Sequence, residues 1–340
     1  MSSVPLPDEY VYVAPAGKGA NAAVQLCLPT VKVKRFIELD RQPSHPAFSS
    51  RMQNLKQSLV AVKVALPQDK SNLLASDVPS WITKKVHDKD ELIKTEYEAL
   101  SGIKDSTAVN AAVMRAYFPE LKQTGPKTFR VGLEDRPCVV LEAIVPSVTL
   151  SDIRYSRERG VTENKLPAAL TYQLLYCLGP ALHFLRYEMK WTHRDIKDDN
   201  IILRPRMDKH GLPQFVLIDF GLARPVGSAQ GFPDGRDFLR IVWGLSKEAE
   251  GEENQGWKIF CATIDELVKN LYTVAGETFQ STWKKLIEIA DKERATRDGH
   301  AAKIQEIYEN IVQREQKFEN NDSDEHILRE AVDKYRGSLT

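Results

Sequence analysis

Two short polar segments of this 340-residue chain carry the residue types needed to move a phosphoryl group. The first, HRDIKDDN, begins at His193, and the second, DFG, begins at Asp219, 19 positions after Asn200. Asp195 can orient a hydroxyl nucleophile, and Lys197 can neutralise the transferred phosphate. The side-chain oxygens of Asn200 and Asp219 are the hard ligands that Mg²⁺ prefers. Together the two segments indicate metal-assisted phosphoryl transfer.

These segments resemble, residue for residue, the catalytic loop and the magnesium loop of the eukaryotic-type protein kinases. A lysine two positions after Asp195 is the form found in Ser/Thr kinases. The resemblance implies an α+β fold with two lobes, a small β-rich N-lobe and a larger helical C-lobe. It also implies ATP and Mg²⁺ as cofactors and a protein hydroxyl as acceptor. Asp195 and Lys197 would be catalytic, and Asn200 and Asp219 would hold the metal.

The composition is that of an ordinary globular protein, with 42% hydrophobic and 28% charged residues. Lys+Arg and Asp+Glu are both 47, so bulk charge favours neither a nucleic acid nor a membrane as partner. The basic run Lys32-Val33-Lys34-Arg35 is interpreted as a solvated strand edge or loop. The four cysteines have no metal-ligand spacing. Neither a signal peptide nor an apolar run of membrane-spanning length is visible, so we expect the cytosol or, alternatively, the nucleus.

Hydrophobic periodicity divides the chain into a strand-rich first part and a helical second part. We expect an N-lobe over residues 1–144 and a C-lobe over residues 145–340. Strand-like runs occupy residues 10–13, 24–28, 58–66, 128–131 and 138–141, and helical spacing covers residues 89–103. Leucines at helical spacing predict a long helix between Leu170 and Leu185. The polar stretch 36–57 looks like an insertion, and two apolar stripes near residues 304–311 and 327–335 predict further helices.

A glycine-rich turn lies between the first two expected strands. Gly17, Gly19, Ala22 and Val24 follow the spacing of the kinase glycine-rich hairpin, with alanine in place of the third glycine. Glycines let backbone amides approach phosphate oxygens because no Cβ stands in the way. The alternative is a simple hairpin turn without a ligand.

Lys63 ends a Val-Ala-Val-Lys strand segment that resembles the kinase strand bearing the phosphate-binding lysine. Residues two apart in a strand point to the same face, so Ala61 and Lys63 share one side. A lysine directed into a cleft needs an anionic partner. Glu96, on the expected helix, is the preferred partner and would complete the catalytic set. Glu98 is the alternative, on a different face of that helix.

The strand that ends near residue 141 leads into a segment that resembles the kinase hinge. The resemblance makes Leu141 the gatekeeper and assigns the adenine edge to backbone groups of Glu142 and Ile144. The base would then lie between three apolar side chains, Val24, Ala61 and Ile202.

The resemblance weakens after the DFG segment. Asp237, expected to hydrogen-bond the catalytic-loop backbone, follows Asp219 by only 18 positions, fewer than is usual in the family. No Ala-Pro-Glu motif is present, so the usual platform for a peptide acceptor is missing. Ser228 is the only hydroxyl residue between Gly221 and Asp237 and is interpreted as a turn serine. His193 and Phe220 are expected to stack and hold Asp219 in place.

Three functions are compatible with these observations. The first is a divergent Ser/Thr protein kinase, favoured by Lys197 and the DFG segment. The second is a kinase-fold phosphotransferase for a small molecule, favoured by the missing peptide platform. The third is a pseudokinase that acts as an interaction module, with the 36–57 stretch and the C-terminal helices as docking surfaces.

Overall fold

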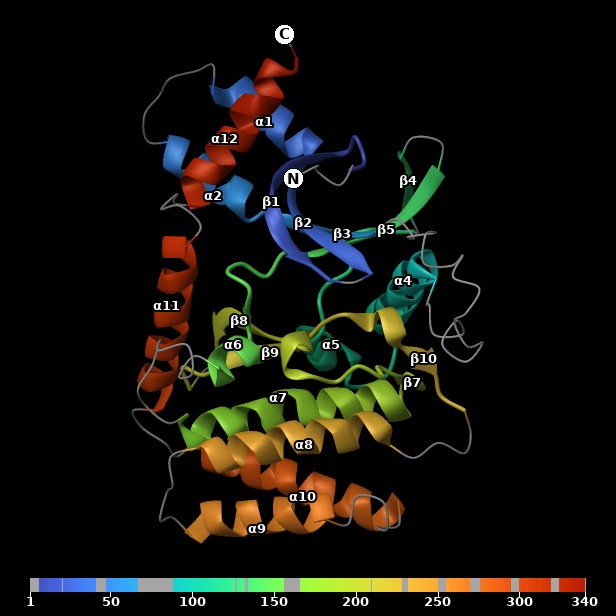
Figure 1. The fold of residues 1–340 in the computed structure, drawn as a ribbon, viewed down its shortest axis with the longest axis vertical. Coiled ribbons are helices and arrows are strands. Elements are labelled where there is room, and N and C mark those ends of the chain that lie inside the picture. Colours follow the sequence, from blue (N-terminus) through green and yellow to red (C-terminus); the bar gives the residue numbers. More distant parts are fainter. Residues whose placement is uncertain are drawn as a thin grey trace, which may run out of the picture. The chain divides into compact units, whose positions relative to one another are not determined.

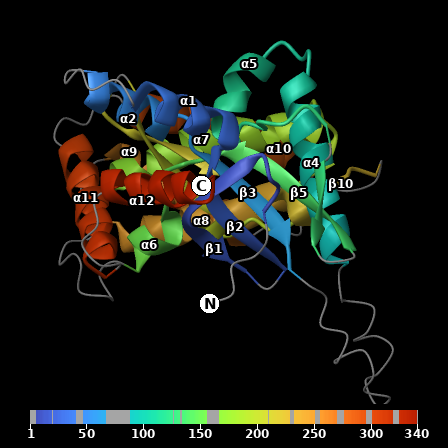
Figure 2. The same ribbon diagram turned by 90° about the horizontal axis from the view of Figure 1, so that it is seen from above.

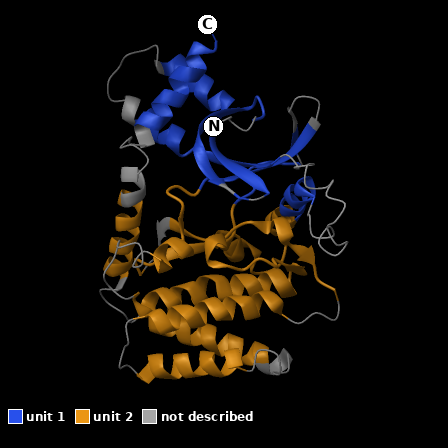
Figure 3. Cartoon of the chain, viewed as in Figure 1, with its two compact units in different colours: residues 1–98, 120–143, 319–340 blue, residues 99–119, 144–318 orange. Residues whose placement is uncertain are grey.

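The computed structural model describes residues 6–19, 21–40, 47–66, 88–125, 127–131, 134–155, 166–208, 210–227, 232–249, 255–269, 276–294, 300–318 and 324–339. The chain forms two compact units (Figure 3). Unit 1 comprises residues 1–98, 120–143 and 319–340, and unit 2 comprises residues 99–119 and 144–318. The chain passes from unit 1 to unit 2 between residues 143 and 144, residues 99–119 are grouped with unit 2, and residues 319–340 are grouped with unit 1. The expected lobes, residues 1–144 and 145–340, stay a prediction.

Unit 1 is built on a five-stranded antiparallel sheet with strand order β1-β2-β3-β5-β4 (Figure 1). Its strands are β1 (Tyr10–Lys18), β2 (Ala22–Pro29), β3 (Val60–Ala65), β4 (Lys127–Val131) and β5 (Glu134–Glu142). The helix α4 (Lys89–Asp105) contributes its residues up to Glu98 to this unit. The strand-like runs and the helical spacing of the sequence predicted these elements correctly, with differences only at their ends.

Two helices between β2 and β3 replace the expected polar insertion. They are α1 (Thr30–Asp40) and α2 (Ala47–Lys56). Each has a buried apolar side that the polar composition conceals, and these residues form a core with β1, β2 and the C-terminal helix α12 (Asp324–Gly337). The core members are Val11, Leu28, Val33, Phe36, Ile37, Met52, Leu55, Leu328 and Val332. Figures 1 and 2 show α12 beside α1 and α2.

Unit 2 is mainly helical and is centred on α7 (Ala168–Tyr187), the long leucine-rich helix that the sequence predicts. All six leucines of its stripe are buried, as are most of its other side chains. A helix that is apolar nearly all round belongs inside a packed domain. It is covered by α8 (Pro233–Glu248) and α10 (Gly276–Arg294), with α9 (Gln255–Lys269) beyond them (Figure 1).

The remaining elements of unit 2 are short, except for one helix. They include two small sheets of order β6-β8-β9 and β10-β7. Their strands are β6 (Val148–Thr149), β7 (Trp191–Thr192), β8 (Ile201–Met207), β9 (Pro213–Leu217) and β10 (Arg224–Pro225). The helices are α5 (Ala111–Met114), α6 (Leu150–Arg154) and α11 (His300–Phe318), with 3₁₀ turns at Arg115–Tyr117, Asp198–Asn200 and Phe220–Leu222.

A buried polar network fastens α10 to the centre of unit 2. Arg294, with 4% of its side chain exposed, forms an ion pair with Asp208 at 2.6 Å and donates to Gln173 Oε1 at 3.3 Å. Its guanidinium also lies 3.3 Å from the ring centroid of Tyr176. The end of α10 is thereby joined to α7 and to the turn after β8. The C-terminal helices, for which the sequence shows no family match, are thus integral parts of the two cores.

Candidate active site

The loop that carries Asp195 is anchored by one buried carboxylate, Asp234. Asp234 Oδ2 accepts from the backbone N–H of His193 at 2.7 Å and from the Thr192 hydroxyl at 2.8 Å. Its Oδ1 accepts from the N–H of Arg194 at 2.9 Å. Arg194 has a φ of 68°, which a non-glycine residue adopts only where its surroundings enforce it. The carboxylate supplies that constraint and thereby sets the course of the loop.

The prediction that Asp237 anchors this loop is wrong. Asp237 lies one turn later on α8, has 43% of its side chain exposed and pairs with Arg240 at 3.1 Å. Asp234 instead follows Pro233 at the start of the helix, where the backbone dipole favours a negative charge. The Pro-Asp pair was a usable signal, because proline favours the first helical position. The interval from Asp219 to the anchoring carboxylate is therefore 15 positions, even shorter than expected.

His193 is a buried structural histidine beneath the loop. Its Nε2 lies 2.9 Å from the carbonyl oxygen of Ile218, which can only accept, so Nε2 carries the proton. Its Nδ1 accepts from the N–H of Asp195 at 3.3 Å. Burial lowers the pKa of His193, which favours the same neutral form. The ring contacts Phe220 at a centroid distance of 4.6 Å, edge to face and not in the stacked arrangement that was expected.

Asp195 is the centre of the polar cluster in unit 2. Lys197 Nζ lies 2.7 Å from Asp195 Oδ2, and Asn200 Nδ2 donates to the same oxygen at 2.9 Å. Asn200 Nδ2 also donates to the backbone carbonyl of Asp195 at 2.8 Å. Because both amide hydrogens of Asn200 are used, its Oδ1 is the atom left for a cation. The cluster thus fixes an oriented carboxylate beside a cation.

The β8–β9 hairpin brings the DFG segment to the same place. Ile201 pairs with Leu217, and the N–H of Ile218 donates to the carbonyl of Asn200 at 2.9 Å. Asn200 and Asp219 therefore lie at one end of this hairpin although 19 positions separate them. Asp219 has a φ of 66°, in the left-handed region that non-glycine residues rarely occupy. Such backbone strain clusters at functional sites, where the surrounding structure holds it.

The ion pair predicted in unit 1 is present between Lys63 and Glu96. The two charged groups are 2.6 Å apart, with 12% and 1% of their side chains exposed. Glu98 is exposed, so the choice of Glu96 over Glu98 as partner is confirmed. A mostly buried lysine that is paired with a carboxylate keeps its charge and a defined position.

Replacing Glu96 with glutamine is expected to lower the free energy of unfolding by about 1–3 kcal/mol, because Lys63 loses a charge-assisted hydrogen bond. Chemical denaturation would measure this. The matched change Glu98→Gln on the exposed side should alter stability by less than about 0.5 kcal/mol. Equal effects of the two changes would contradict a structural role for the ion pair.

Four of the predicted nucleotide-binding residues share one face of the unit 1 sheet. Val24 is paired with Lys63, and Ala61 is paired with Leu141 across neighbouring strands. Directly paired residues point to the same side of a sheet. The opposite face is the packed one, where Val60, Val62 and Val64 are buried with Cys27 and Cys138. Burial raises the pKa of the Cys27 thiol to about 12, so this thiol is inert packing.

The glycine turn forms the predicted β1–β2 hairpin. Gly17 pairs with Val24, and the N–H of Gly19 donates to the carbonyl of Ala22 at 2.9 Å. A Cβ added to Gly17 would meet no atom within 4 Å, so packing does not demand glycine there. The open space around this backbone leaves room for a ligand.

The predicted hinge residues differ in whether their backbone groups and side chains are free to contact adenine. The N–H of Glu142 is already bonded to the carbonyl of Glu120 at 2.8 Å, so only its carbonyl could meet a base edge. Ile144 is half-buried, and Ile202 is buried on β8 opposite Val216. Contact of these residues with adenine stays a prediction.

Sequence reasoning missed Arg154, which ties the catalytic loop to two helices. Its guanidinium is paired with Asp198 in the loop and with Glu248 at the end of α8. Burial raises the pKa of Asp198, and the charge of Arg154 opposes that shift. A Cβ on Gly244 would come within 3.0 Å of Arg154 Nη2, so the glycine makes room for the guanidinium. No motif in the sequence points to this pairing.

The chain after the DFG segment returns at once to the start of the catalytic loop. Arg224 of β10 pairs with Thr192 of β7, and the N–H of Val226 donates to the backbone carbonyl of Lys190 at 2.8 Å. Ser228 lies outside the described residues. Phe232 then packs edge to face on Trp283 at a centroid distance of 5.3 Å, directly before α8 begins. Phe232, in the described part of this segment, therefore helps to fix where α8 begins. The segment contains no Ala-Pro-Glu motif.

Within the described ranges, no group of three or more His, Cys, Asp or Glu side chains could hold a metal ion. This finding is compatible with Asn200 and Asp219 as a two-residue site, because Mg²⁺ usually completes its shell with phosphate oxygens and water. No described helix is long and apolar enough to cross a bilayer.

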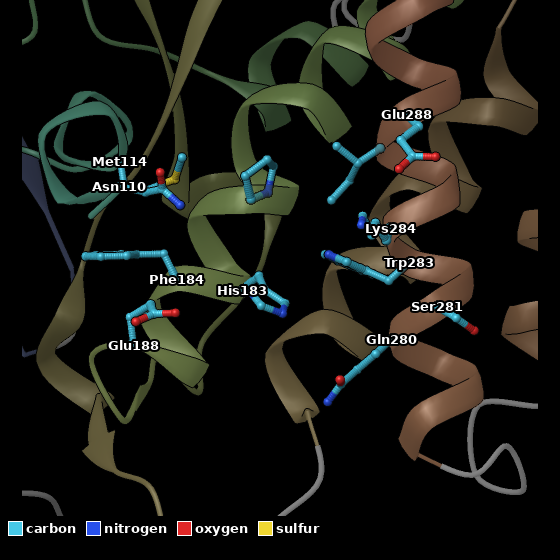
Figure 4. Close-up of a pocket in the computed structure, with 12 residues that line it drawn as sticks. Asn110, Met114, His183, Phe184, Glu188, Gln280, Ser281, Trp283, Lys284 and Glu288 are labelled. Atoms are coloured by element: carbon cyan, nitrogen blue, oxygen red, sulfur yellow. The ribbon is translucent and has the colours of Figure 1, made fainter. Parts of the chain in front are cut away.

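A cavity of about 640 Å³ lies elsewhere in unit 2, between α7 and α10 (Figure 4). Its lining combines apolar side chains such as Met114, Phe184 and Trp283 with polar ones such as His183 and Glu188. None of the predicted site residues lines it.

Comparison with known proteins supports a distant kinase relationship. No protein-family model matches the chain. The chain is 23% identical over 205 residues to a serine/threonine-protein kinase C from Synechocystis sp. (strain ATCC 27184 / PCC 6803 / Kazusa). The match covers 60% of this chain and 32% of that protein, so the chain spans about a third of its relative's length. With a sheet unit and a helical unit compatible with a kinase-like fold, these findings support a kinase-like relationship.

Proposed function

We propose that this chain is an ATP- and Mg²⁺-dependent phosphotransferase whose acceptor is a serine or threonine hydroxyl of a protein. The observation that carries the proposal is the convergence of Lys197 and Asn200 on one oxygen of Asp195, at 2.7 and 2.9 Å. The distant similarity to a Ser/Thr protein kinase supports the same chemistry. Two close charged pairs give further support, Lys197 with Asp195 at 2.7 Å and Lys63 with Glu96 at 2.6 Å.

Asp195 would hold the acceptor hydroxyl and accept its proton. Its carboxylate is aligned by Asn200 and is fixed to a loop that Asp234 anchors, so little reorganisation is needed when substrate arrives. Lys197 lies beside the same carboxylate, where it can neutralise negative charge on the phosphoryl group in transit. His193 is buried and neutral, so it supports the loop and takes no part in the proton transfer.

Asn200 and Asp219 would hold Mg²⁺. The fit is good, because the Asn200 amide hydrogens are committed to Asp195 and its oxygen remains, while Asp219 lies at the same end of the hairpin. Bound Mg²⁺ would neutralise the charge of the nucleotide phosphates.

In unit 1, Lys63 is held by Glu96 and would pair with the α- and β-phosphates of ATP. The backbone of the Gly17–Ala22 turn would cover the phosphates, and Val24, Ala61 and Leu141 would offer an apolar surface to the base.

A second candidate is transfer to a small-molecule hydroxyl. The observation that favours it is the 15-position interval between Asp219 and Asp234, which leaves little chain for a peptide-binding platform. The catalytic residues would have the same roles, so only the acceptor differs.

The test is transfer of label from γ-labelled ATP to casein, myelin basic protein and the chain itself, with nucleotide binding measured in parallel. Label on protein supports a protein kinase. Nucleotide binding without protein labelling, together with slow ATP hydrolysis, would shift the proposal to a small-molecule acceptor. A chain that binds no nucleotide would overturn both enzymatic functions and leave an interaction module.

Removing Mg²⁺ with EDTA is expected to abolish transfer, because the phosphate charge is then no longer neutralised at Asn200 and Asp219. Added Mg²⁺ should restore the rate, and the variant Asp219→Asn should need a higher Mg²⁺ concentration or fail. A rate that is unchanged by EDTA would contradict the proposed metal site.

A further inference from the structure

A second cavity, with a more polar lining, lies in unit 1 between α1 and α2. It has a volume of about 510 Å³, within the range of ligand-binding sites. Its lining residues are Lys32, Arg35, Phe36, Leu39, Arg51, Asn54, Leu55, Gln57 and Ser58. Three of the nine are cations and none is an acid, although the whole chain has no net charge.

Within the described ranges, the cations of this cavity have no anionic side chain as a partner. Lys32 and Arg35 are exposed and, among the residues that the structure describes, they form no ion pair or side-chain hydrogen bond. Arg51 donates from Nη1 to the carbonyl of Leu39 at 2.5 Å, which fixes its guanidinium at the cavity. Its Nε is buried and has no acceptor in the described part of the chain. A concentration of positive charge with an unused buried donor is suited to an anion.

Lys32 and Arg35 lie on a different side of α1 from the neighbouring Lys34. The basic run expected at a strand edge or in a loop lies instead on α1, with Val33 buried in the core. At 3.6 residues per turn, Lys32 and Arg35 fall on the same side of α1, and Lys34 falls on another. Lys34 is exposed and does not line the cavity. Lys34 therefore provides a control residue of equal charge on the same helix.

The other lining residues indicate what kind of molecule bears the anionic group. Phe36 and Leu55 form a buried apolar floor, and Leu39 is a large apolar side chain with 43% exposure at the rim. Asn54 and Gln57 add amides that can both donate to and accept from a peptide backbone. A guanidinium fork matches the oxygens of a phosphate monoester, and the apolar floor can take a neighbouring side chain.

We propose that the α1–α2 cavity binds a phosphoserine- or phosphothreonine-containing peptide that has an apolar residue next to the phosphoresidue. Arg51 and Arg35 would hold the phosphate, Lys32 would add charge, and the amides of Asn54 and Gln57 would hold the backbone. The binding requires neither ATP nor catalysis and is independent of the proposed kinase activity. Because only 15 positions separate Asp219 from Asp234, such a cavity would be a separate means of holding a protein partner.

The test is fluorescence polarisation of the full chain with a labelled degenerate phosphoserine/phosphothreonine peptide library, without ATP. The same library after phosphatase treatment is the comparison. We expect saturable binding of the phosphorylated library only, weakened by about tenfold or more in Arg35→Glu and in Lys32→Glu. Lys34→Glu, with the same charge change, should bind like the wild type, and affinity should fall as salt rises.

All three residues are exposed, so these variants should fold, which circular dichroism and melting temperature would verify. Equal binding of the two libraries would overturn the proposal, and so would an equal loss in Lys34→Glu and Arg35→Glu. Binding only to phosphatidylcholine vesicles that contain a phosphoinositide would assign the cavity to a lipid headgroup instead. Displacement of the peptide by inorganic phosphate is expected for a phosphate site, and its failure would count against one.

Discussion

Replacing Asp195 with asparagine is expected to lower the rate of phosphoryl transfer by about 10²- to 10⁴-fold, the usual contribution of a positioned acid or base. Asparagine keeps the size of the side chain but removes the basic oxygen on which Lys197 and Asn200 converge. Nucleotide binding should change little, because the phosphates are assigned to other residues. Initial rates at saturating ATP, with nucleotide affinity measured separately, would check this.

The matched control is Asp199→Asn, which makes the same change of charge four positions away on an exposed side chain. It should keep most of the activity. A variant Asp195→Asn that transfers phosphate at the wild-type rate would show that any activity arises elsewhere in the chain. If both variants lose activity equally, the effect is one of overall charge and not of the position of Asp195.

Replacing Asp234 with alanine is expected to reduce the free energy of unfolding by about 3–5 kcal/mol, among the largest effects of a single substitution. The change strands three donors at once, the N–H groups of His193 and Arg194 and the hydroxyl of Thr192. Two of these donors are on residues that are almost fully buried, so water cannot replace the carboxylate at low cost. Transfer activity should fall as well, because the loop bearing Asp195 loses its anchor.

Denaturant unfolding of Asp234→Ala and Asp237→Ala would test this directly. Asp237 has 43% of its side chain exposed and pairs with Arg240 on its own helix, so its loss should cost less than about 0.5 kcal/mol. If Asp234→Ala does not fold, Asp234→Asn provides a milder comparison, since one acceptor oxygen remains. A larger loss in Asp237→Ala than in either Asp234 variant would reverse the assignment made from the structure.

The difference between Asp234 and Asp237 illustrates where sequence reasoning stops. Both are acidic residues near the start of one helix, and both follow the DFG segment at a plausible distance. Which carboxylate meets the loop depends on the residue at which α8 begins and on its rotation. Phe232, packed against Trp283 from a helix some fifty positions later, helps to fix that start. Local patterns do not encode such a distant contact.

Distant contacts also explain why local sequence patterns did not predict the helices α1 and α2 of unit 1. The composition of residues 36–57 predicts an insertion, because charged and polar side chains dominate it. Its few apolar residues become a core only when Leu328 and Val332 of α12 pack against them. Nothing in residues 36–57 points to a partner almost three hundred positions away. The grouping of the chain's last residues with its first ones was for that reason not predictable.

Local sequence patterns were sufficient to predict several of the longer elements and the polar residues that could do chemistry. Strand and helix periods follow from how the backbone directs successive side chains, so β3, α4 and α7 could be read locally. The spacing within HRDIKDDN and the hairpin between Asn200 and Asp219 are likewise local, and they bring the predicted polar groups together. The choice of Glu96 over Glu98 succeeded because helical period alone separates their faces.

The groups that hold those residues in place become apparent only from how the helices pack. Asp234, Arg154 and Glu248 act across long sequence separations, and their roles arise from buried hydrogen bonds that form once the helices have packed. The α1–α2 cavity is of the same kind, because Arg51 meets the cations of α1 only when the two helices share a core. Chemistry is carried by short segments with fixed internal geometry, whereas support and docking depend on packing between distant segments.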